Sequence, residues 1–178
     1  MYDSIKSDVY RVYGKADLPT VLAAFFQDAT LRFLIVLRIK QRGRGFWKLV
    51  GKVLWRLNKT KKSIQISPET QIGYGLYIGH GGPIVVNPTA VIGNNCNLSQ
   101  FLTIGSIHGQ AAGLGDNVYI GPSVCLVEAV HIGDNATIGA GSVVTKDIPE
   151  NATAVGNYAK VIHYKNPGQY IHNPWPLR

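Results

Sequence analysis

The chain has 178 residues, the length of one folded domain with a short appendage. Hydrophobic residues make up 46% of it, which favours a packed core and argues against a disordered protein. The formal net charge is +8, but half of the 18 Lys and Arg residues fall between Lys40 and Lys62. The excess positive charge is therefore concentrated in one segment. The polar start, Met1–Lys6, lacks the pattern of a signal peptide, and we expect a cytoplasmic protein.

A helical period runs from residue 18 to about residue 57. Apolar side chains recur there at steps of three and four residues, the spacing of one face of an α-helix. Gly43 and Gly45 interrupt the pattern. We therefore predict two or three helices with a break near Arg42–Gly45, within a basic N-terminal region of residues 1–63. The apolar run Phe33–Leu37 is much too short to span a bilayer.

The basic segment of residues 40–62 is open to three interpretations: a solvated helix face, a membrane-surface helix, or a nucleic-acid patch. Phe46, Trp47 and Trp55 alternate with Lys and Arg, which favours an interfacial helix whose aromatic rings sit among lipid headgroups. No recognised nucleic-acid module accompanies the charge, so nucleic acid is not an expected partner. Peripheral contact with the inner face of a membrane is retained as a hypothesis.

From Ile66 onward the period of the apolar residues changes to six, and glycine follows many of them. A hexapeptide period is typical of a parallel β-helix, in which each hexad forms one short strand and one corner. The period breaks twice, by two extra residues before Val86 and by four between Ile104 and Leu114. The thirteen positions in phase are Ile66, Ile72, Ile78, Val86, Ile92, Leu98, Ile104, Leu114, Ile120, Leu126, Ile132, Ile138 and Val144.

The hexads can be sorted by face, because a triangular coil uses three of them. Allowing for the two insertions, we expect Ile78, Leu98, Ile120 and Ile138 to stack on one face in successive coils. The residues that follow them then share one edge, and three coil steps along it span about 14 Å at about 4.8 Å per step. In chain order this edge carries Gly79-His80, Ser99-Gln100, Gly121-Pro122 and Gly139-Ala140.

Several motifs in the repeat region are similar to those of a known enzyme family. Over residues 64–162 the chain resembles serine acetyltransferases and related hexapeptide-repeat acyltransferases. A basic helical start followed by such a β-helix also resembles the acetyltransferases of bacterial capsule and exopolysaccharide gene clusters. The motifs are Ile78-Gly79-His80-Gly81-Gly82, Thr89-Ala90-Val91-Ile92-Gly93, Gln100-Phe101-Leu102-Thr103-Ile104-Gly105, Ile138-Gly139-Ala140-Gly141-Ser142-Val143-Val144 and Val155-Gly156-Asn157-Tyr158-Ala159-Lys160-Val161-Ile162.

The resemblance implies a mainly β protein, a left-handed parallel β-helix over residues 64–164 with a C-terminal tail of residues 165–178. It further implies a homotrimer with active sites between neighbouring β-helices, acetyl-CoA as donor and a hydroxyl as acceptor. The family's base histidine falls on His80, and an imidazole that titrates near neutrality suits that task. The alternative for His80 is an exposed corner histidine without a role.

The edge that carries His80 is long enough for an extended pantetheine arm. The small residues along it would let the arm lie against backbone amides. We therefore expect acetyl-CoA to contact Gly121, Pro122, Gly139 and Ala140 on this edge. Gly105, at the end of one of the motifs, is also expected to contact acetyl-CoA. Lys146 and Lys160 are expected to meet the CoA phosphates, with plain surface charge as the alternative for Lys160.

Two residues are candidates for acceptor binding. Gln100 lies one coil beyond His80 on the same edge. His108 is the only titratable residue of the expansion Ser106–Gly113, which we predict to be an extruded loop; in the family such a loop reaches the next subunit. The alternative for His108 is a solvated loop residue.

The chain departs from serine acetyltransferases at two places. Those enzymes carry Asp immediately before the base histidine, where this chain has Gly79, and an Arg-His pair near the end of the loop, where it has Gln110-Ala111. A free amino acid needs partners for its ammonium and carboxylate groups. We therefore expect a saccharide hydroxyl as acceptor, in surface polysaccharide biosynthesis, with serine in cysteine biosynthesis as the alternative.

Two other classes of protein use this type of fold. Zinc-dependent γ-type carbonic anhydrases need three converging histidines, and His80, His108 and His131 include no near pair, so no metal is expected. A non-catalytic scaffold would need neither His80 nor a column of small residues. Cys96 and Cys125 lack ligand-like spacing and are expected to be small buried apolar groups rather than a disulfide.

Overall fold

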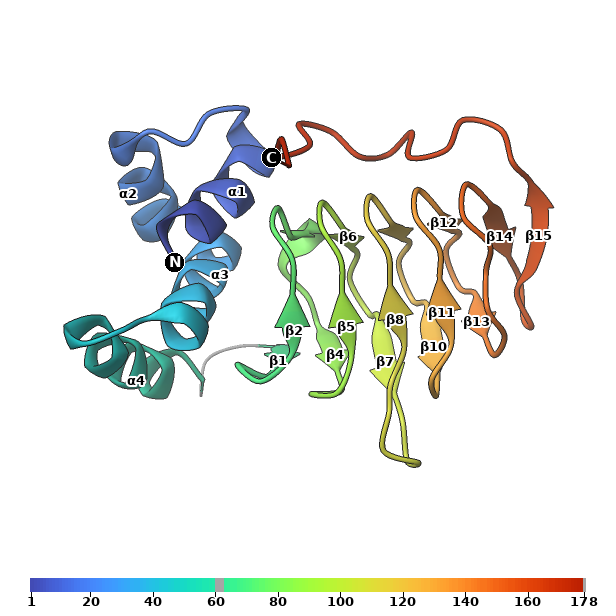
Figure 1. The fold of residues 1–178 in the computed structure, drawn as a ribbon, viewed down its shortest axis with the longest axis horizontal. Helices are drawn as coiled ribbons and strands as arrows, with labels where there is room; N and C mark the ends of the chain where they lie inside the picture. The colour runs from blue at the N-terminus through green and yellow to red at the C-terminus, as the bar shows by residue number, and fades with distance from the viewer. Residues whose placement is uncertain (60–62, 178) are drawn as a thin grey trace.

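The computed structural model describes residues 1–59 and 63–177 and consists of four helices followed by a parallel β-helix (Figure 1). The helices are α1 (Tyr2–Tyr13), α2 (Leu18–Gln27), α3 (Ala29–Arg42) and α4 (Phe46–Lys59). They gather at one end of the β-helix, and strand β15 forms the other end. The break predicted at Arg42–Gly45 separates α3 from α4.

Local signals explain where the helices begin and end. Asp17 caps α2 by accepting a hydrogen bond from the Thr20 amide, and Asp28 caps α3 by accepting from the amides of Thr30 and Leu31. Gly14 closes α1 in the left-handed conformation, with φ of 66°. The three helices α2, α3 and α4 agree with the two or three predicted from residue 18 to about residue 57, whereas α1 precedes that range and was not predicted. Its buried face has no apolar period, since it includes Ser4, Ser7, Asp8 and Arg11.

In the described part of the chain, the β-helix is built from three sheets of parallel strands. Each sheet takes every third strand as far as β13, and β14 and β15 are added to the third sheet. The first sheet has the order β1-β4-β7-β10-β13, the second β11-β8-β5-β2, and the third β15-β14-β12-β9-β6-β3. Among the strands that the structure describes, only β15 runs antiparallel to its neighbour. The strands are β1 (Ile64–Ile66), β2 (Gln71–Ile72), β3 (Tyr77–Ile78), β4 (Ile84–Val86), β5 (Val91–Ile92), β6 (Asn97–Leu98), β7 (Thr103–Gly105), β8 (Gly113–Leu114), β9 (Tyr119–Ile120), β10 (Cys125–Val127), β11 (His131–Ile132), β12 (Thr137–Ile138), β13 (Val143–Val144), β14 (Thr153–Val155) and β15 (Lys160–His163).

The hexapeptide prediction is confirmed position by position. All thirteen aliphatic residues in phase point inward and are at most 6% exposed. The residue two places before each of them also points inward, so each strand sends two side chains into the core. The two breaks in the period are accommodated at corners, as the short 3-10 helix Gly79–Gly81 and as a loop between β7 and β8. Cys96 is buried as expected, and Cys125 is half-buried; both are free thiols.

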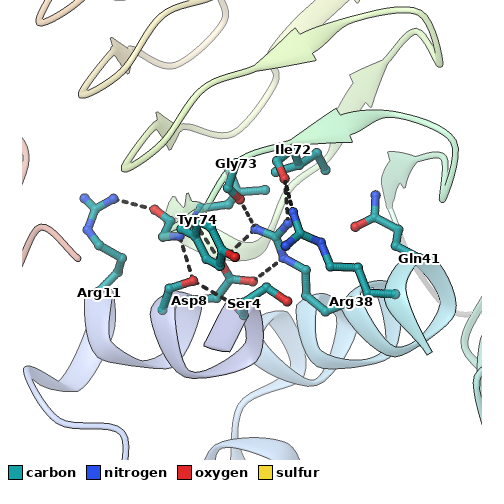
Figure 2. A network of polar contacts seen from close by, with 12 residues as sticks. Ser4, Asp8, Arg11, Arg38, Gln41, Ile72, Gly73 and Tyr74 are labelled. Carbon is teal, nitrogen blue, oxygen red and sulfur yellow. Dashed lines mark hydrogen bonds and ion pairs between the residues drawn. The ribbon is translucent and has the colours of Figure 1, made fainter. Parts of the chain in front are cut away.

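A buried ion pair fastens the helices to the first coil of the β-helix (Figure 2). Asp8 of α1 and Arg38 of α3 are 2.8 Å apart and at most 1% exposed. Arg38 also donates to the carbonyls of Ile72 and Gly73, and Asp8 accepts from the Leu76 amide at 2.9 Å. The first coil has no coil before it, so its outward backbone groups would otherwise lack partners. The helices therefore act as the end cap of the β-helix.

Further polar side chains complete this cap. The Gly75 amide donates to the Ser7 hydroxyl at 2.9 Å, and Arg11 donates to the Gly75 carbonyl at 2.6 Å. Gln41 of α3 donates to the Thr70 carbonyl at 2.9 Å. Three backbone groups of one coil, at Gly75 and Thr70, are thus hydrogen-bonded by side chains from α1 and α3. No repeated sequence pattern accompanies these contacts.

The C-terminal tail returns along the β-helix to α1 (Figure 1). The Tyr170 carbonyl accepts from the Asn97 side chain at 2.8 Å, and the His172 carbonyl accepts from Arg11 at 2.9 Å. Trp175 bonds Asn95 through its amide and carbonyl and packs edge-on against the Tyr10 ring, 5.5 Å away. The tail thus contacts its own chain at both the β-helix and the helical cap.

Within the described residues no single helix is both long and apolar enough to cross a membrane. The pair α2 and α3 meets the requirement for length and composition only when taken together, and the two helices are bent by 114°.

Candidate active site

His80 projects from a glycine-rich corner between β3 and β4. It forms the centre of the 3-10 turn Gly79–Gly81 and has φ of 57°, in the left-handed region. Gly81 and Gly82 follow with φ of 71° and 95°. Such a run of positive φ angles is accessible at low cost only when glycine dominates it. The turn leaves the imidazole exposed at the corner, while Ile78 just before it stays in the core.

The predicted stacking of the strands that precede this corner is confirmed by their pairing. Ile78 pairs with Leu98, Leu98 with Ile120, and Ile120 with Ile138, all in parallel register. The corner residues that follow them therefore lie in one column, coil upon coil. The structure thus brings together His80, Gln100, Gly121, Pro122, Gly139 and Ala140.

Gln100 has an unusual side chain in this column. Its Oε1 atom is buried and accepts no hydrogen bond from any described residue. An unsatisfied buried acceptor costs about 1–3 kcal/mol, which a donor from outside this chain would remove. Gln100 lies one coil step, about 5 Å, from the His80 corner.

The glycines of the column have a packing role of their own. A Cβ atom at Gly121 would lie 2.8 Å from the Ala140 amide nitrogen, and one at Gly139 would lie 2.6 Å from a methyl carbon of Val155. Close approach of successive coils therefore already requires glycine at both positions. At Gly105 the nearest atom would be 4.0 Å away, in Thr103, so packing does not require glycine there.

The remaining predicted site residues lie elsewhere on the chain. Gly105 ends β7 in the first sheet, and His108 and Lys146 follow at corners between the first and second sheets. These three are not brought to the His80 corner of the same chain. Lys160 begins β15 and pairs with Val155 in the third sheet, at its far end from β3 and His80. His108, Lys146 and Lys160 are all exposed.

Glu128 holds the base of the predicted loop. Its carboxylate accepts from the Ser106 hydroxyl at 2.8 Å and from the amides of Ile107 and His108 at 3.3 and 3.4 Å. These hydrogen bonds, the one from Ser106 first, lower the pKa of Glu128 despite partial desolvation. No role was predicted for Glu128 from the sequence. An acidic residue at the coil corner next to an inserted loop could have indicated a side chain that binds the loop.

The other end of the loop is anchored as well. Ala111 is 2% exposed, and its amide donates to the Thr89 hydroxyl at 2.9 Å. The loop that carries His108 is therefore held by hydrogen bonds on both sides of its exposed tip, through Glu128 and Thr89.

A cavity of about 410 Å³ opens between His80 and the helical region. Asp28 and Thr30 at the start of α3 line it together with Tyr77 and His80. Asp28 uses one carboxylate oxygen to cap α3. Sequence reasoning missed Asp28, because only the docking of the helices on the first coil brings a residue 52 positions away to His80.

A larger cavity, of about 740 Å³, lies on the first sheet between Trp55 of α4, Val85 and Gly105. Gly105, one of the residues expected to contact acetyl-CoA, lines this cavity, whereas His80 does not. The predicted site is thus divided between two regions of a single chain.

Comparison with known proteins agrees with this architecture. The sequence profile described as "Bacterial transferase hexapeptide (six repeats)" matches residues 112–146. The serine acetyltransferase of Helicobacter pylori is 35% identical over 118 residues, covering 64% of this chain and 68% of that enzyme. The serine acetyltransferase of Synechococcus elongatus is 33% identical over 119 residues, covering 65% of this chain and 49% of that enzyme.

A solved structure extends the similarity into the helical region. The Neisseria gonorrhoeae serine acetyltransferase, crystallised in complex with serine, superposes with a TM-score of 0.73 at 28% identity, covering 90% of this chain and 68% of that one. The chain belongs to the serine acetyltransferase family of hexapeptide-repeat acyltransferases. It spans about half the length of the cyanobacterial relative.

Proposed function

We propose that this protein transfers an acetyl group from acetyl-CoA to a hydroxyl group, with His80 as general base. The neutral imidazole accepts the proton of the acceptor hydroxyl while the hydroxyl oxygen attacks the thioester carbonyl carbon of acetyl-CoA. The carbon–sulfur bond then breaks, and the CoA thiolate takes up the proton from the imidazolium. The products are the acetyl ester and free CoA, and no covalent enzyme intermediate is needed.

The observation that carries this proposal is the column of corner residues below His80. An exposed imidazole stands at one end of an edge whose next three coils present Gln100, Gly121-Pro122 and Gly139-Ala140. The edge spans about 14 Å, enough for an extended pantetheine arm. Lys160 pairs with Val155 at the end of the same sheet, and its cationic side chain is the proposed partner of the CoA phosphates.

The proposal includes a homotrimer, because a single chain separates the predicted residues. Gly105, His108 and Lys146 belong to corners other than that of His80. In a trimer of side-by-side β-helices, these corners of one copy face the His80 corner of the next. The tied-down loop would then bring His108 of one copy to the acceptor held at His80 of its neighbour.

L-Serine is the first acceptor to consider. The relatives named above are serine acetyltransferases, and the gonococcal structure contains serine. Asp28 lines the same cavity as His80, and its carboxylate offers a partner for the ammonium group of an amino acid.

A saccharide hydroxyl is the second candidate, favoured by two positions. Gly79, where the resembling enzymes carry Asp, has no side chain to contribute. Ala111 lies in the stretch where they carry an Arg-His pair, and it is buried with its amide bonded to Thr89. No cation from that stretch is therefore available for the carboxylate of serine, whereas a sugar requires none.

The test is an acceptor screen with purified protein and acetyl-CoA, in which released CoA thiol is followed. L-Serine and a panel of hexoses and amino sugars are compared for the wild type and for His80→Ala. We expect the substitution to lower kcat by about 10²–10⁴-fold, the usual contribution of a general base. His131→Ala is the matched control, since His131 is an exposed histidine on β11 in another sheet.

The possible results separate the parts of the proposal. A rate for His80→Ala within a few-fold of wild type would disprove the mechanism. Turnover of serine without any sugar would eliminate the second acceptor, and turnover of sugars alone would eliminate the first. Absence of CoA binding in a calorimetric titration of the wild type would contradict acetyl transfer as a whole.

A further inference from the structure

Helix α4 turns one face toward the protein and leaves the opposite face uncovered. On the inner face, Gly51 lies directly on α3, where a Cβ atom would be 3.0 Å from the Cα atom of Lys40. The Trp55 ring packs on Phe33 of α3 with centroids 5.8 Å apart. Gly51 and Trp55 therefore attach the inner face of α4 to α3, and Leu54 also packs against the core.

The outer face of α4 is apolar. Phe46, Leu49, Val53 and Leu57 follow one another at steps of three and four residues and so form one stripe. They are 73%, 61%, 52% and 63% exposed, respectively. Large apolar side chains exposed in a row along one helix mark an interaction surface rather than scattered surface residues.

A second stripe on α4 is cationic and runs beside the apolar one. Lys48, Lys52 and Arg56 recur at steps of four residues, and all three are exposed. The single ion pair among the described residues, Asp8–Arg38, does not involve them. Their charges are therefore available to an external partner.

The charge around α4 is uniformly positive. From residue 29 to residue 68 the sequence contains no Asp or Glu. The positive charge of this stretch therefore exceeds the net charge of +8 of the whole chain, and the rest of the chain carries a net negative charge. Its cations are Arg32, Arg38, Lys40, Arg42, Arg44, Lys48, Lys52, Arg56, Lys59, Lys61 and Lys62.

We propose that the outer face of α4 docks on the surface of a membrane that contains anionic lipids. The stripe of Phe46, Leu49, Val53 and Leu57 would enter the boundary between headgroups and acyl chains, and the flanking cations would meet lipid phosphates. A second copy of the same surface is a poor partner, because its cations repel those of the first. A nucleic acid would meet the cations but would leave the apolar stripe uncovered.

This surface also suits the placement of the proposed active site. The helices sit at one end of the β-helix, whereas the corner column runs along its length (Figure 1). Docking through α4 would hold the enzyme at the bilayer without covering the far end of that column. The inference does not depend on the acceptor or on His80.

The test is co-sedimentation of the full chain with vesicles of phosphatidylcholine alone or mixed with phosphatidylglycerol. We expect binding to the mixed vesicles at low salt and its loss at high salt, since salt screens exposed charges. The triple variant Lys48→Gln/Lys52→Gln/Arg56→Gln should lower the partition coefficient by about 10²-fold, because each cation near an anionic surface contributes about fivefold. Leu49→Asp/Val53→Asp should abolish binding.

Matched controls keep the experiment decisive. Ile162→Asp makes the same type of change at an exposed residue, 56% accessible, on β15 at the opposite end of the molecule, and should bind like the wild type. Circular dichroism and thermal unfolding verify that each variant is folded. Failure of the wild type to bind anionic vesicles at low salt would overturn the proposal. Concentration-dependent self-association that Leu49→Asp/Val53→Asp removes would assign the face to a second copy instead.

Discussion

The β-helix and its helical cap are held together by different physical means. Each coil of the β-helix repeats the same inward aliphatic positions, so its core grows by addition of equivalent layers. The cap is attached instead through a non-repeating polar network, centred on Asp8 and Arg38 with the backbone of Ile72, Gly73 and Leu76. Ser7, Arg11 and Gln41 add hydrogen bonds to it, and apolar residues of α1 and α3 continue the core. When a contact in one coil of the β-helix is lost, the equivalent contacts in the other coils remain. When a contact in the polar network of the cap is lost, no equivalent contact elsewhere replaces it. The comparison predicts that the junction is the more vulnerable region.

The largest expected effect therefore comes from Arg38→Met. Removing the guanidinium leaves the Asp8 carboxylate buried without its partner, which we expect to lower the free energy of unfolding by about 3–5 kcal/mol. Urea titration followed by circular dichroism measures the change. Arg32→Met on the same helix is the control and should cost less than about 1 kcal/mol, because Arg32 is only half-buried and bonds two carbonyls at 3.3 Å.

The double variant Asp8→Ala/Arg38→Met sharpens the same point. It removes the unpaired charge as well, so it should recover part of the lost stability. A double variant as unstable as the sum of its single variants would show that the two residues do not act as a pair.

A smaller loss is expected within the β-helix from Ile120→Ala. Ile120 is fully buried in β9, in the middle of the third sheet, and truncation leaves a cavity that costs about 2–5 kcal/mol. The same denaturant titration applies, with Val91→Ala at a 38% exposed outward position as control. If Ile120→Ala destabilises the chain more than Arg38→Met does, the junction is not the weaker region.

The smallest effect concerns the loop and should be local. The pKa of Glu128 is lowered by its hydrogen bonds from Ser106, Ile107 and His108, so the stabilising contribution of the carboxylate is complete above its usual pKa near 4.5. It is lost as the pH falls through the lower pKa of the folded state. We expect the amide signals of Ile107 and His108 in NMR spectra to titrate with a midpoint below 4.5.

Glu128→Gln should remove this titration and raise the KM for the acceptor several-fold with little change in kcat, because the loop positions His108 rather than the base. Glu150→Gln, at an exposed carboxylate on another corner, should change neither quantity. Equal kinetics of Glu128→Gln and the wild type would show that the loop needs no anchor.

Much of the site could be predicted because it repeats with the fold. Once the hexads are in phase, the register of Ile78, Leu98, Ile120 and Ile138 follows, and the corner column below His80 follows from it. Gly105, His108 and Lys146 show the limit of this reasoning, since the structure places them away from the His80 corner of the same chain. Asp28 lies outside the repeat, and the contacts of both Asp28 and Glu128 are seen only in the folded chain.

The sequence by itself determined the β-helix, its inward residues, its two insertions and the break before α4, because each is a local period or an interruption of one. Tertiary structure alone decided that a helix with a polar buried face, α1, caps the first coil. It also decided that Asp28 shares a cavity with His80, and that the tail returns to Arg11 and Asn97. The reason is physical: periodic patterns record which side of an element is buried. Single polar contacts between distant segments depend on where those segments dock. Such contacts produce no periodic pattern in the sequence.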